Sequence, residues 1–312
     1  MKISYVQHEN IDKEKWDRCI ENAANGLIYA RSYFLDIMSK NWDALVMNDY
    51  EVVMPLTWRR KFGISYLRQP AFTQQLGIFG NFSINNDVAE EFINKALELF
   101  SFAEINLNFA NEYKRAAAIR CNLILSLNRP FIEIENNFRK DFVKKIKDNN
   151  LIFEVSDEAE KAILLFKQTY SKKLHTSESG YENLIQLCLV LTNKGQLLVR
   201  KVSSQDGKLL AIAIFFKDKK RIYYILSTTL PEGRKLDANY FLLYHLIKEF
   251  SEQNLIFDFE GSEIPSINFF FRKFGAIEQP YPFVRINQLP VWKKWIKKIY
   301  DYYKFRSKES RI

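Results

Sequence analysis

Cysteine, glycine and proline are scarce in this sequence. Its 312 residues include three cysteines, Cys19, Cys121 and Cys188, which form no C-x-x-C pair. A disulfide framework and a cysteine-based zinc site are therefore not expected, and a reducing, cytoplasmic setting fits this composition. The 10 glycines and 8 prolines are few for this length, which favours long regular elements over a loop-rich scaffold.

Long apolar runs are missing, and the main body carries little net charge. No stretch of 18 apolar residues occurs, and the first residues lack the apolar segment of a signal peptide, so neither a membrane span nor secretion is expected. The net charge is +9, of which residues 290–312, with eight basic and two acidic side chains, supply +6. Residues 1–289 carry the remaining net charge of +3, which does not indicate a DNA-binding surface.

Two stretches of the chain follow the same order of expected elements: three strands, a helix and a further strand. The first has strands at 44–47, 51–59 and 64–68, a helix at 87–100 that Asp87 could cap, and a strand at 104–109. The second has strands at 196–202, 208–216 and 221–227, a helix at 237–250 and a strand at 255–259. The repeat predicts an α/β (α+β) fold of two tandem units, each a mixed, mostly antiparallel sheet flanked by helices. We expect the units at 1–130 and 131–289, followed by a basic amphipathic helix at 290–312.

The strand expected at 255–259 delivers two carboxylates, Asp258 and Glu260, to its end. Residues two apart on a strand point to the same side, so Phe257 and Phe259 would face a core on the other side. A carboxylate desolvated at such a position can take the proton of an attacking amine. The alternative is that one acid caps the next helix and the other pairs with a basic side chain.

A glycine and two bases, Gly233, Arg234 and Lys235, precede the helix expected at 237–250. Unpaired N–H groups at a helix N-terminus favour an anion such as a phosphate. The alternative is a surface turn with solvated bases, in which Asp237 caps the helix and would repel a phosphate.

The C-terminal half resembles the acyltransferases of the GNAT superfamily, and the whole chain resembles their FemAB-like tandem branch. The matching segments run from Gly207 to Ile214, Tyr223 to Thr229, Ala238 to Tyr240, Asp258 to Ser262 and Phe271 to Gly275. The resemblance implies that the second unit carries the reaction and that the first is a degenerate platform. No metal site is expected, because His8 and His245 have no partner at ligand spacing. Acyl-CoA, such as acetyl-CoA, would be the co-substrate.

The resemblance also implies positions for donor and acceptor. Backbone groups at Ser227, Thr228 and Thr229 would hold the acyl arm of the donor, and its phosphates would lie near the Gly233–Asn239 loop, which includes Ala238. The loop at 69–77 resembles the acceptor-facing loop of FemAB-like proteins, so its acceptor-site candidates are Gln69, Phe72, Gln74 and Gln75. Tyr224 and Tyr240 are further candidates for substrate contact. The alternatives are a structural crossover for the loop and core packing for the tyrosines.

Two departures from these families leave the donor open. Residues 230–239 contain one glycine, whereas GNAT proteins place Gln/Arg-x-x-Gly-x-Gly/Ala there. The heptad arm common in tRNA-using FemAB enzymes has no counterpart. Acyl-CoA is therefore the expected donor, and aminoacyl-tRNA is the alternative. The acceptor would be an amine on a small molecule, a sugar or a cell-envelope precursor.

Two features point beyond catalysis. The single glycine in the donor loop also suits a catalytically inactive scaffold or a membrane-surface binding module. The segment 290–312 places Trp292, Trp295, Ile296 and Ile299 on one helical face, opposite four lysines. We expect this face to pack on the body, and the alternative is peripheral contact with an anionic membrane.

Overall fold

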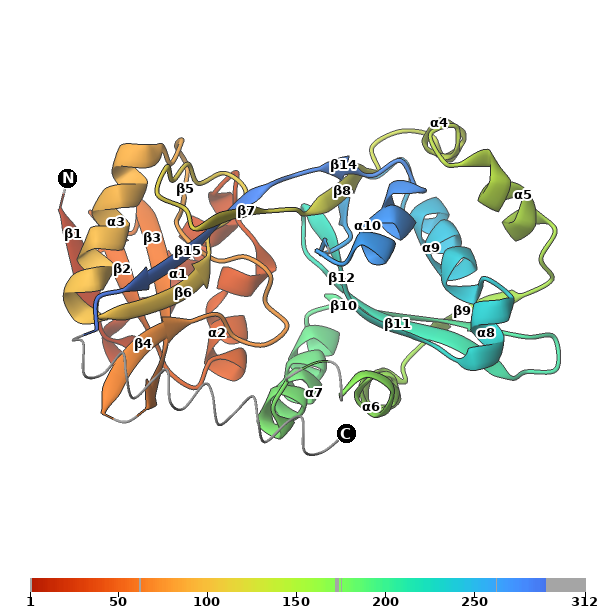
Figure 1. The fold of residues 1–312 in the computed structure, drawn as a ribbon, viewed down its shortest axis with the longest axis horizontal. Helices are drawn as coiled ribbons and strands as arrows, with labels where there is room; N and C mark the ends of the chain where they lie inside the picture. Colours follow the sequence, from red (N-terminus) through yellow and green to blue (C-terminus); the bar gives the residue numbers. More distant parts are fainter. Residues whose placement is uncertain (1, 62, 172–173, 175, 262, 290–312) are drawn as a thin grey trace.

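The computed structural model describes residues 2–289 except 62, 172–173, 175 and 262, so the helix expected at 290–312 lies outside the described residues. Two mixed sheets flanked by helices build this part of the chain (Figure 1). The arrangement confirms the expected α/β fold of two tandem units.

The first sheet combines the N-terminal strands with one strand from the far end of the chain. Its spatial order is β1-β2-β3-β4-β6-β15-β7, and β5 pairs with β3. The strands are β1 (Ile3–Val6), β2 (Trp42–Met47), β3 (Val52–Lys61), β4 (Ile64–Arg68), β5 (Phe79–Gly80), β6 (Phe102–Asn106), β7 (Ala118–Arg120) and β15 (Tyr281–Asn287).

The second sheet has the order β14-β8-β13-β12-β11-β10-β9. Its strands are β8 (Leu123–Ser126), β9 (Ile152–Ser156), β10 (Leu197–Ser203), β11 (Leu209–Lys217), β12 (Arg221–Thr229), β13 (Ile256–Asp258) and β14 (Ile277–Glu278). Most neighbours in both sheets are antiparallel, as expected, while β4 and β6 pair in parallel, as do β12 and β13.

Helices cover both sheets. They are α1 (Lys13–Asn22), α2 (Ser32–Met38), α3 (Asn86–Leu99), α4 (Phe131–Glu135), α5 (Lys140–Lys147), α6 (Ala159–Tyr170), α7 (Glu178–Asn193), α8 (Pro231–Lys235), α9 (Ala238–Glu249) and α10 (Pro265–Arg272). The N-cap of α3 is Asn85, whose side chain accepts from the Val88 N–H group. The expectation that Asp87 caps this helix is wrong, because the helix begins one residue before Asp87.

The parallel strands confirm the expected correspondence between the two units. In each unit a helix, α3 or α9, leads to a strand that runs parallel to a strand before that helix: β6 pairs with β4, and β13 pairs with β12. Both strands are shorter than expected: β6 ends at Asn106 and β13 at Asp258. Functional side chains can collect at the carboxyl ends of these parallel strands, at the edge of each sheet.

The chain crosses between the sheets twice. Strand β7 pairs with β15 in the first sheet, and two residues later β8 joins the second sheet beside β13. Strand β15 then leaves the second unit and pairs with β6 along five residues (Figure 1). The first unit, expected at 1–130, thus includes a strand from 281–287 and gives β8 to the second sheet.

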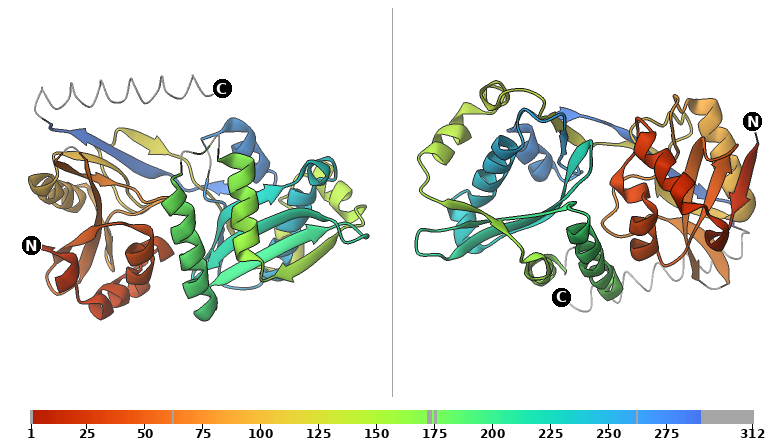
Figure 2. Two further views of the ribbon diagram at one scale, coloured as in Figure 1. Left: turned by 90° about the horizontal axis from the view of Figure 1, so that it is seen from below. Right: turned by 180° about the vertical axis from the view of Figure 1, so that it is seen from behind.

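An apolar core joins the two units. Tyr29 and Phe34 of the first unit pack with Leu187 of α7 and with Phe216 and Tyr223 of the second sheet. All five side chains are at most 1% exposed. Figure 2 shows α7 lying between the helices of the first unit and the second sheet. Burial of this extent holds the units as one body.

Candidate functional site

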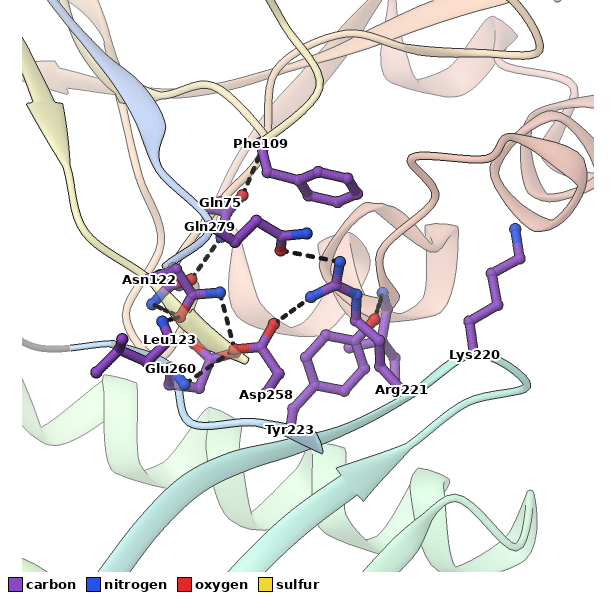
Figure 3. Close-up of polar contacts among 12 residues, drawn as sticks. Gln75, Phe109, Asn122, Leu123, Lys220, Arg221, Tyr223, Asp258, Glu260 and Gln279 are labelled. Atoms are coloured by element: carbon purple, nitrogen blue, oxygen red, sulfur yellow. Dashed lines mark hydrogen bonds and ion pairs between the residues drawn. The ribbon is translucent and has the colours of Figure 1, made fainter. Parts of the chain in front are cut away.

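Asp258, the last residue of β13, is fixed by three hydrogen bonds inside the protein (Figure 3). Its Oδ2 accepts from Arg221 Nη1 at 2.6 Å, and its Oδ1 accepts from Asn122 Nδ2 and from the Glu260 N–H group, both at 2.9 Å. Asp258 is 1% exposed and Arg221 3%. Asp258 is thus the acid that pairs with a basic side chain, and the pair ties β13 to the start of β12.

Arg221 stays charged because of Asp258. Burial is the largest single influence and lowers the pKa of the guanidinium, but Asp258, Tyr223 and Asp218 together raise it by more, so the net direction is upward. The Arg221 Nη2 atom donates to Gln279 Oε1 at 3.0 Å, and the guanidinium lies over the Phe109 ring, 4.6 Å from its centroid. Arg221 therefore reaches from the second unit to an aromatic residue of the first (Figure 3).

Glu260 has a different environment. Its φ of 60° turns the backbone away from the strand direction, so the expectation that Asp258 and Glu260 share one face of a strand is wrong. Its Oε1 accepts a hydrogen bond from the Tyr29 hydroxyl of the first unit. Burial, followed by the charge of Asp258, raises the pKa of Glu260 well above its usual range, and the Tyr29 hydrogen bond and Arg221 oppose this rise.

The contrast between the two acids decides what each can do. Both carboxylate oxygens of Asp258 accept hydrogen bonds from donors inside the protein. Glu260 is partly exposed and forms no ion pair with a described residue. A carboxyl of raised pKa on a partly exposed residue is a candidate for proton transfer during a reaction.

The glycine after Glu260 lets the chain approach the crossing between the sheets. Gly261 has a φ of +47°, and a Cβ atom there would lie 2.3 Å from the Cys121 carbonyl oxygen. The neighbouring Asn122 Oδ1 accepts from Gln74 Nε2 at 3.2 Å. This close approach therefore places the Asp258–Glu260 segment beside the loop at 69–77.

The expected acceptor loop reaches this network through two of its four candidate residues. Gln74 contacts Asn122, and the Gln75 Oε1 atom accepts from the Phe109 N–H group at 2.8 Å. Gln69 lies further back, where its Oε1 accepts from the Asn106 N–H group at 3.2 Å. The Gln69 Nε2 atom is buried and has no partner among the described residues.

Phe72 lies elsewhere. Its ring packs against Tyr181 of α7 at 5.6 Å between centroids, and against Phe166 of α6 at 6.5 Å. The structure thus places Phe72 in the packing between the units and away from the Asp258 network.

The expected donor edge lies along β12. Pairing between β12 and β13 ends at Tyr223 and Asp258, although β12 continues to Thr229. A register shift opposite Ile214 and Phe215 marks a β-bulge in the middle of β12. From Tyr224 onward, no described strand pairs with this edge of β12, so its backbone groups can bind an extended ligand.

The polar candidates along this edge form a cluster. Ser227 Oγ and Tyr224 Oη both donate to Asn239 Oδ1 of α9, at 2.9 and 3.0 Å. Thr228 Oγ1 is buried and has no partner among the described residues. Tyr240 packs against Phe270 at 4.3 Å between centroids, and its hydroxyl accepts from Lys273 Nζ at 2.7 Å.

The loop expected to cradle phosphates is instead the short helix α8. Gly233 is buried in it, and Arg234 Nε donates to the Thr229 carbonyl at 3.1 Å. Lys235 is exposed, and Ala238 is buried at the start of α9. Asp237 precedes α9 with a φ of 53° and makes no side-chain cap, so the capping hydrogen bond of the alternative interpretation is wrong.

Gly233→Ala is expected to lower the free energy of unfolding by about 1–3 kcal/mol, the usual cost of overpacking. The added Cβ would lie 2.2 Å from the Leu210 carbonyl oxygen, which already accepts from the Leu230 N–H group at 2.9 Å. Urea unfolding would measure the change. Lys235→Ala, at an exposed position of the same helix, is the control and should change stability by less than about 0.5 kcal/mol. Equal stabilities of the two variants would contradict this role of Gly233.

Four residues of the site are absent from the sequence-based prediction: Tyr29, Asn122, Arg221 and Gln279. A lone arginine opening an otherwise apolar strand was a usable signal for Arg221. Tyr29 lies in a buried 3-10 turn within a short apolar run, and nothing local marks its hydroxyl as a partner of Glu260. Asn122 and Gln279 contact Asp258 and Arg221 only because distant strands pair in the folded chain, so no local pattern marks them.

The described residues offer no metal site and no membrane-spanning helix. Among them, no group of three or more His, Cys, Asp or Glu side chains could hold a metal ion. None of their helices combines the length and the apolar character that a membrane crossing requires.

Comparison with known proteins identifies the fold. Residues 138–263 match the family model described as an acetyltransferase (GNAT) domain. The solved structure of FemX superposes with a TM-score of 0.66 at 14% identity, covering 94% of this chain and 99% of that one. No curated protein sequence matches.

Two further structures share the fold along most of their length. A conserved protein of unknown function from Bacteroides thetaiotaomicron gives a TM-score of 0.58 at 10% identity, covering 92% of this chain and 100% of that one. The C-terminal domain of a putative lysylphosphatidylglycerol synthetase from Agrobacterium fabrum gives 0.51 at 13% identity, covering 89% and 92%. The chain therefore has the fold of FemX, and residues 138–263 of its second unit are similar to a GNAT acetyltransferase domain.

Proposed function

We propose that this protein is an N-acyltransferase in which Glu260 accepts the proton of the attacking amine. The observation that carries the proposal is the environment of Glu260: a partly exposed carboxyl of raised pKa, hydrogen-bonded to Tyr29, at the point where β13 ends beside the unpaired edge of β12. The match of residues 138–263 to an acetyltransferase domain supports the reaction class.

The step balances as follows. The amine nitrogen forms a bond to the donor's carbonyl carbon while the Glu260 carboxylate takes a proton from that nitrogen. The bond from the carbonyl carbon to the sulfur or oxygen of the donor then breaks, and the leaving atom takes up the proton that Glu260 received, which returns Glu260 to its carboxylate form. The raised pKa of Glu260 makes its ionised carboxylate a stronger base, which takes the proton of the amine more readily than an ordinary carboxylate does.

Asp258 acts as a positioning residue. Its Oδ1 accepts from the Glu260 N–H group and its Oδ2 holds Arg221. These contacts fix the turn that aims Glu260 at Tyr29, and the charge of Asp258 helps to raise the pKa of Glu260. The acceptor amine would approach from the side of Gln74 and Phe109.

Acyl-CoA remains the first donor to consider. The acyl arm would lie along β12 from Tyr224 to Thr229, near Ser227 and Asn239, and the diphosphate near Arg234 and Lys235 of α8, the helix before α9. The amine would belong to a small molecule, a sugar or a cell-envelope precursor.

Aminoacyl-tRNA is the second candidate donor, and α8 favours it. Gly233 packs against the Leu210 carbonyl oxygen and is not free to let backbone N–H groups surround a diphosphate. The FemX-like fold, which covers 94% of this chain, agrees with this candidate because FemAB-like enzymes of peptidoglycan bridges use charged tRNA.

A thermal-unfolding screen against coenzyme A thioesters and charged tRNA tests the donor. A donor at about one hundred times its Kd should stabilise the folded chain by about 2.7 kcal/mol, because it binds the folded state alone. Binding of charged tRNA should also weaken steeply with added salt. Stabilisation by neither donor, together with no transfer to any amine offered, would overturn the proposal in favour of an inactive scaffold.

A further inference from the structure

The outer side of α10 carries exposed apolar side chains beside the crossing from β7 to β8 (Figure 1). Phe269 of α10 is 53% exposed and Ile119 of β7 is 65% exposed, and both line a hollow of about 490 Å³. Apolar side chains gathered at a surface mark a binding surface more often than scattered ones do. We call this surface the α10 face and define it by residues around the hollow: Ile119, Glu263, Pro265, Phe269 and Arg272.

The core of the second unit uses one side of α10. Among the eight residues of this helix, only Phe271 is buried, and its ring packs against Phe259 at 4.9 Å between centroids. Ile264, just before the helix, and Ile267 within it are also exposed apolar side chains. A helix that only covers a sheet carries polar residues on its outer side. The apolar outer side of α10 therefore suits a contact with a second molecule.

An open sheet edge adds to the α10 face. Strand β7 is the outermost strand of the first sheet, and its outer edge pairs with no described strand. Ile119, in the middle of β7, is opposite Pro282 of β15. Unpaired backbone groups along an outer strand can bind a strand of another chain. The face thus offers backbone hydrogen bonds beside its apolar side chains.

The charges around the hollow are balanced. Arg120 pairs with Glu263 at 3.3 Å, and Arg272 pairs with Glu278. Two further bases lie over the Phe269 ring. They are Arg139, which pairs with Asp141, and Lys273.

This balance distinguishes between two kinds of partner. The three ion pairs and Lys273 give the face four bases and three acids. An anionic membrane attracts surfaces with a clear excess of basic groups, and the α10 face has little excess. A protein surface that carries both signs is the better electrostatic match.

We propose that the α10 face is the contact surface of a homodimer, in which two copies of α10 lie antiparallel across a two-fold axis. In such a dimer the same surface of both copies meets, so it has to be complementary to itself. The α10 face has this property, because it combines a hollow with exposed apolar side chains and acids with bases. The antiparallel arrangement brings Glu263, before the start of α10, towards Arg272 at the end of the other copy's helix. The inference is independent of the proposed acyl transfer.

Analytical ultracentrifugation of the full chain across the micromolar range tests the dimer. We expect the average mass to rise with concentration towards that of two chains. Phe269→Glu should raise the dimer Kd at least about tenfold, because the contact would bury an unpaired charge. Ile119→Lys changes the other wall of the hollow and should have the same effect. The control is Leu189→Glu, at a position of α7 that is 58% exposed, and it should leave the Kd unchanged.

Two results would rule out the homodimer. One is a chain that stays monomeric throughout, and the other is an equal rise in Kd for the Leu189 control. A monomeric chain that binds phosphatidylglycerol vesicles, and loses this binding through Phe269→Glu but not through Leu189→Glu, would assign the face to a membrane. Unchanged circular dichroism of the variants shows that the fold is kept.

Charge reversal tests the two-fold arrangement. Glu263→Arg and Arg272→Glu should each weaken the dimer, because each brings like charges together across the axis. An equimolar mixture of the two variants should dimerise more tightly than either alone, since each chain supplies the charge that the other needs. A mixture that dimerises no better than its components contradicts the antiparallel contact.

Discussion

Glu260→Gln is expected to lower the rate of acyl transfer by about 10²–10⁴-fold, the usual contribution of a positioned general base. The amide is nearly isosteric, and its oxygen can still accept from the Tyr29 hydroxyl, so the loss would come from the missing base. Steady-state rates with the donor identified by the thermal screen would measure it. Glu263→Gln is the matched control, since Glu263 is a nearby exposed acid whose side chain is 68% accessible. Equal rates of the Glu260 variant and the wild type would remove Glu260 from the mechanism.

The same substitution should also change how stability depends on pH. The pKa of Glu260 is raised in the folded chain, so between the unfolded value near 4.3 and the folded value the native state holds a proton that the unfolded state has released. Wild-type stability should therefore fall as pH rises through that window. The Gln variant lacks this proton, so it should gain stability relative to the wild type as pH rises through that window. Urea unfolding at a series of pH values from about 4 upward measures the difference.

Asp258→Ala is expected to lower the free energy of unfolding by about 3–5 kcal/mol, because it leaves a charged partner buried and unpaired. Arg221 is 3% exposed, and the substitution also removes the acceptor of the Asn122 amide and of the Glu260 N–H group. Urea unfolding is the measurement.

A surface pair provides the comparison for Asp258. Lys95 and Glu98 form an ion pair of 2.6 Å with side chains 36% and 61% exposed, so Glu98→Ala should cost less than about 1 kcal/mol. The double variant Asp258→Leu, Arg221→Met should recover part of the loss, since it leaves no buried charge. A cost for Asp258→Ala as small as that for Glu98→Ala would contradict a structural role of the buried pair.

Local patterns were sufficient for the elements that carry their own signal. Helix α9 forms where a helix is expected at 237–250, and the strands expected at 196–202 and 208–216 pair with each other as β10 and β11. The short strands β7, β8 and β15 were not predicted. Their partners lie far away along the chain, and β15 becomes a strand because β6 has an open edge.

The candidate site, like the fold, was predictable only where a local pattern marks its residues. The acids at the end of β13 follow from an apolar strand with a charged end, but the left-handed turn at Glu260 does not. That turn separates the roles of the two carboxylates: one stays with Arg221 and the other reaches Tyr29. Both partners are set by the packing of one unit on the other, which a single strand cannot reveal.

Strand β15 bears on how the protein is made. During synthesis, residues 1–126 emerge from the ribosome long before Tyr281–Asn287. During that interval the nascent first sheet lacks the strand that covers β6 and links it to β7. Unpaired backbone groups along such an edge are a template for association with other chains. The first sheet can therefore be completed only after the ribosome has synthesised β15.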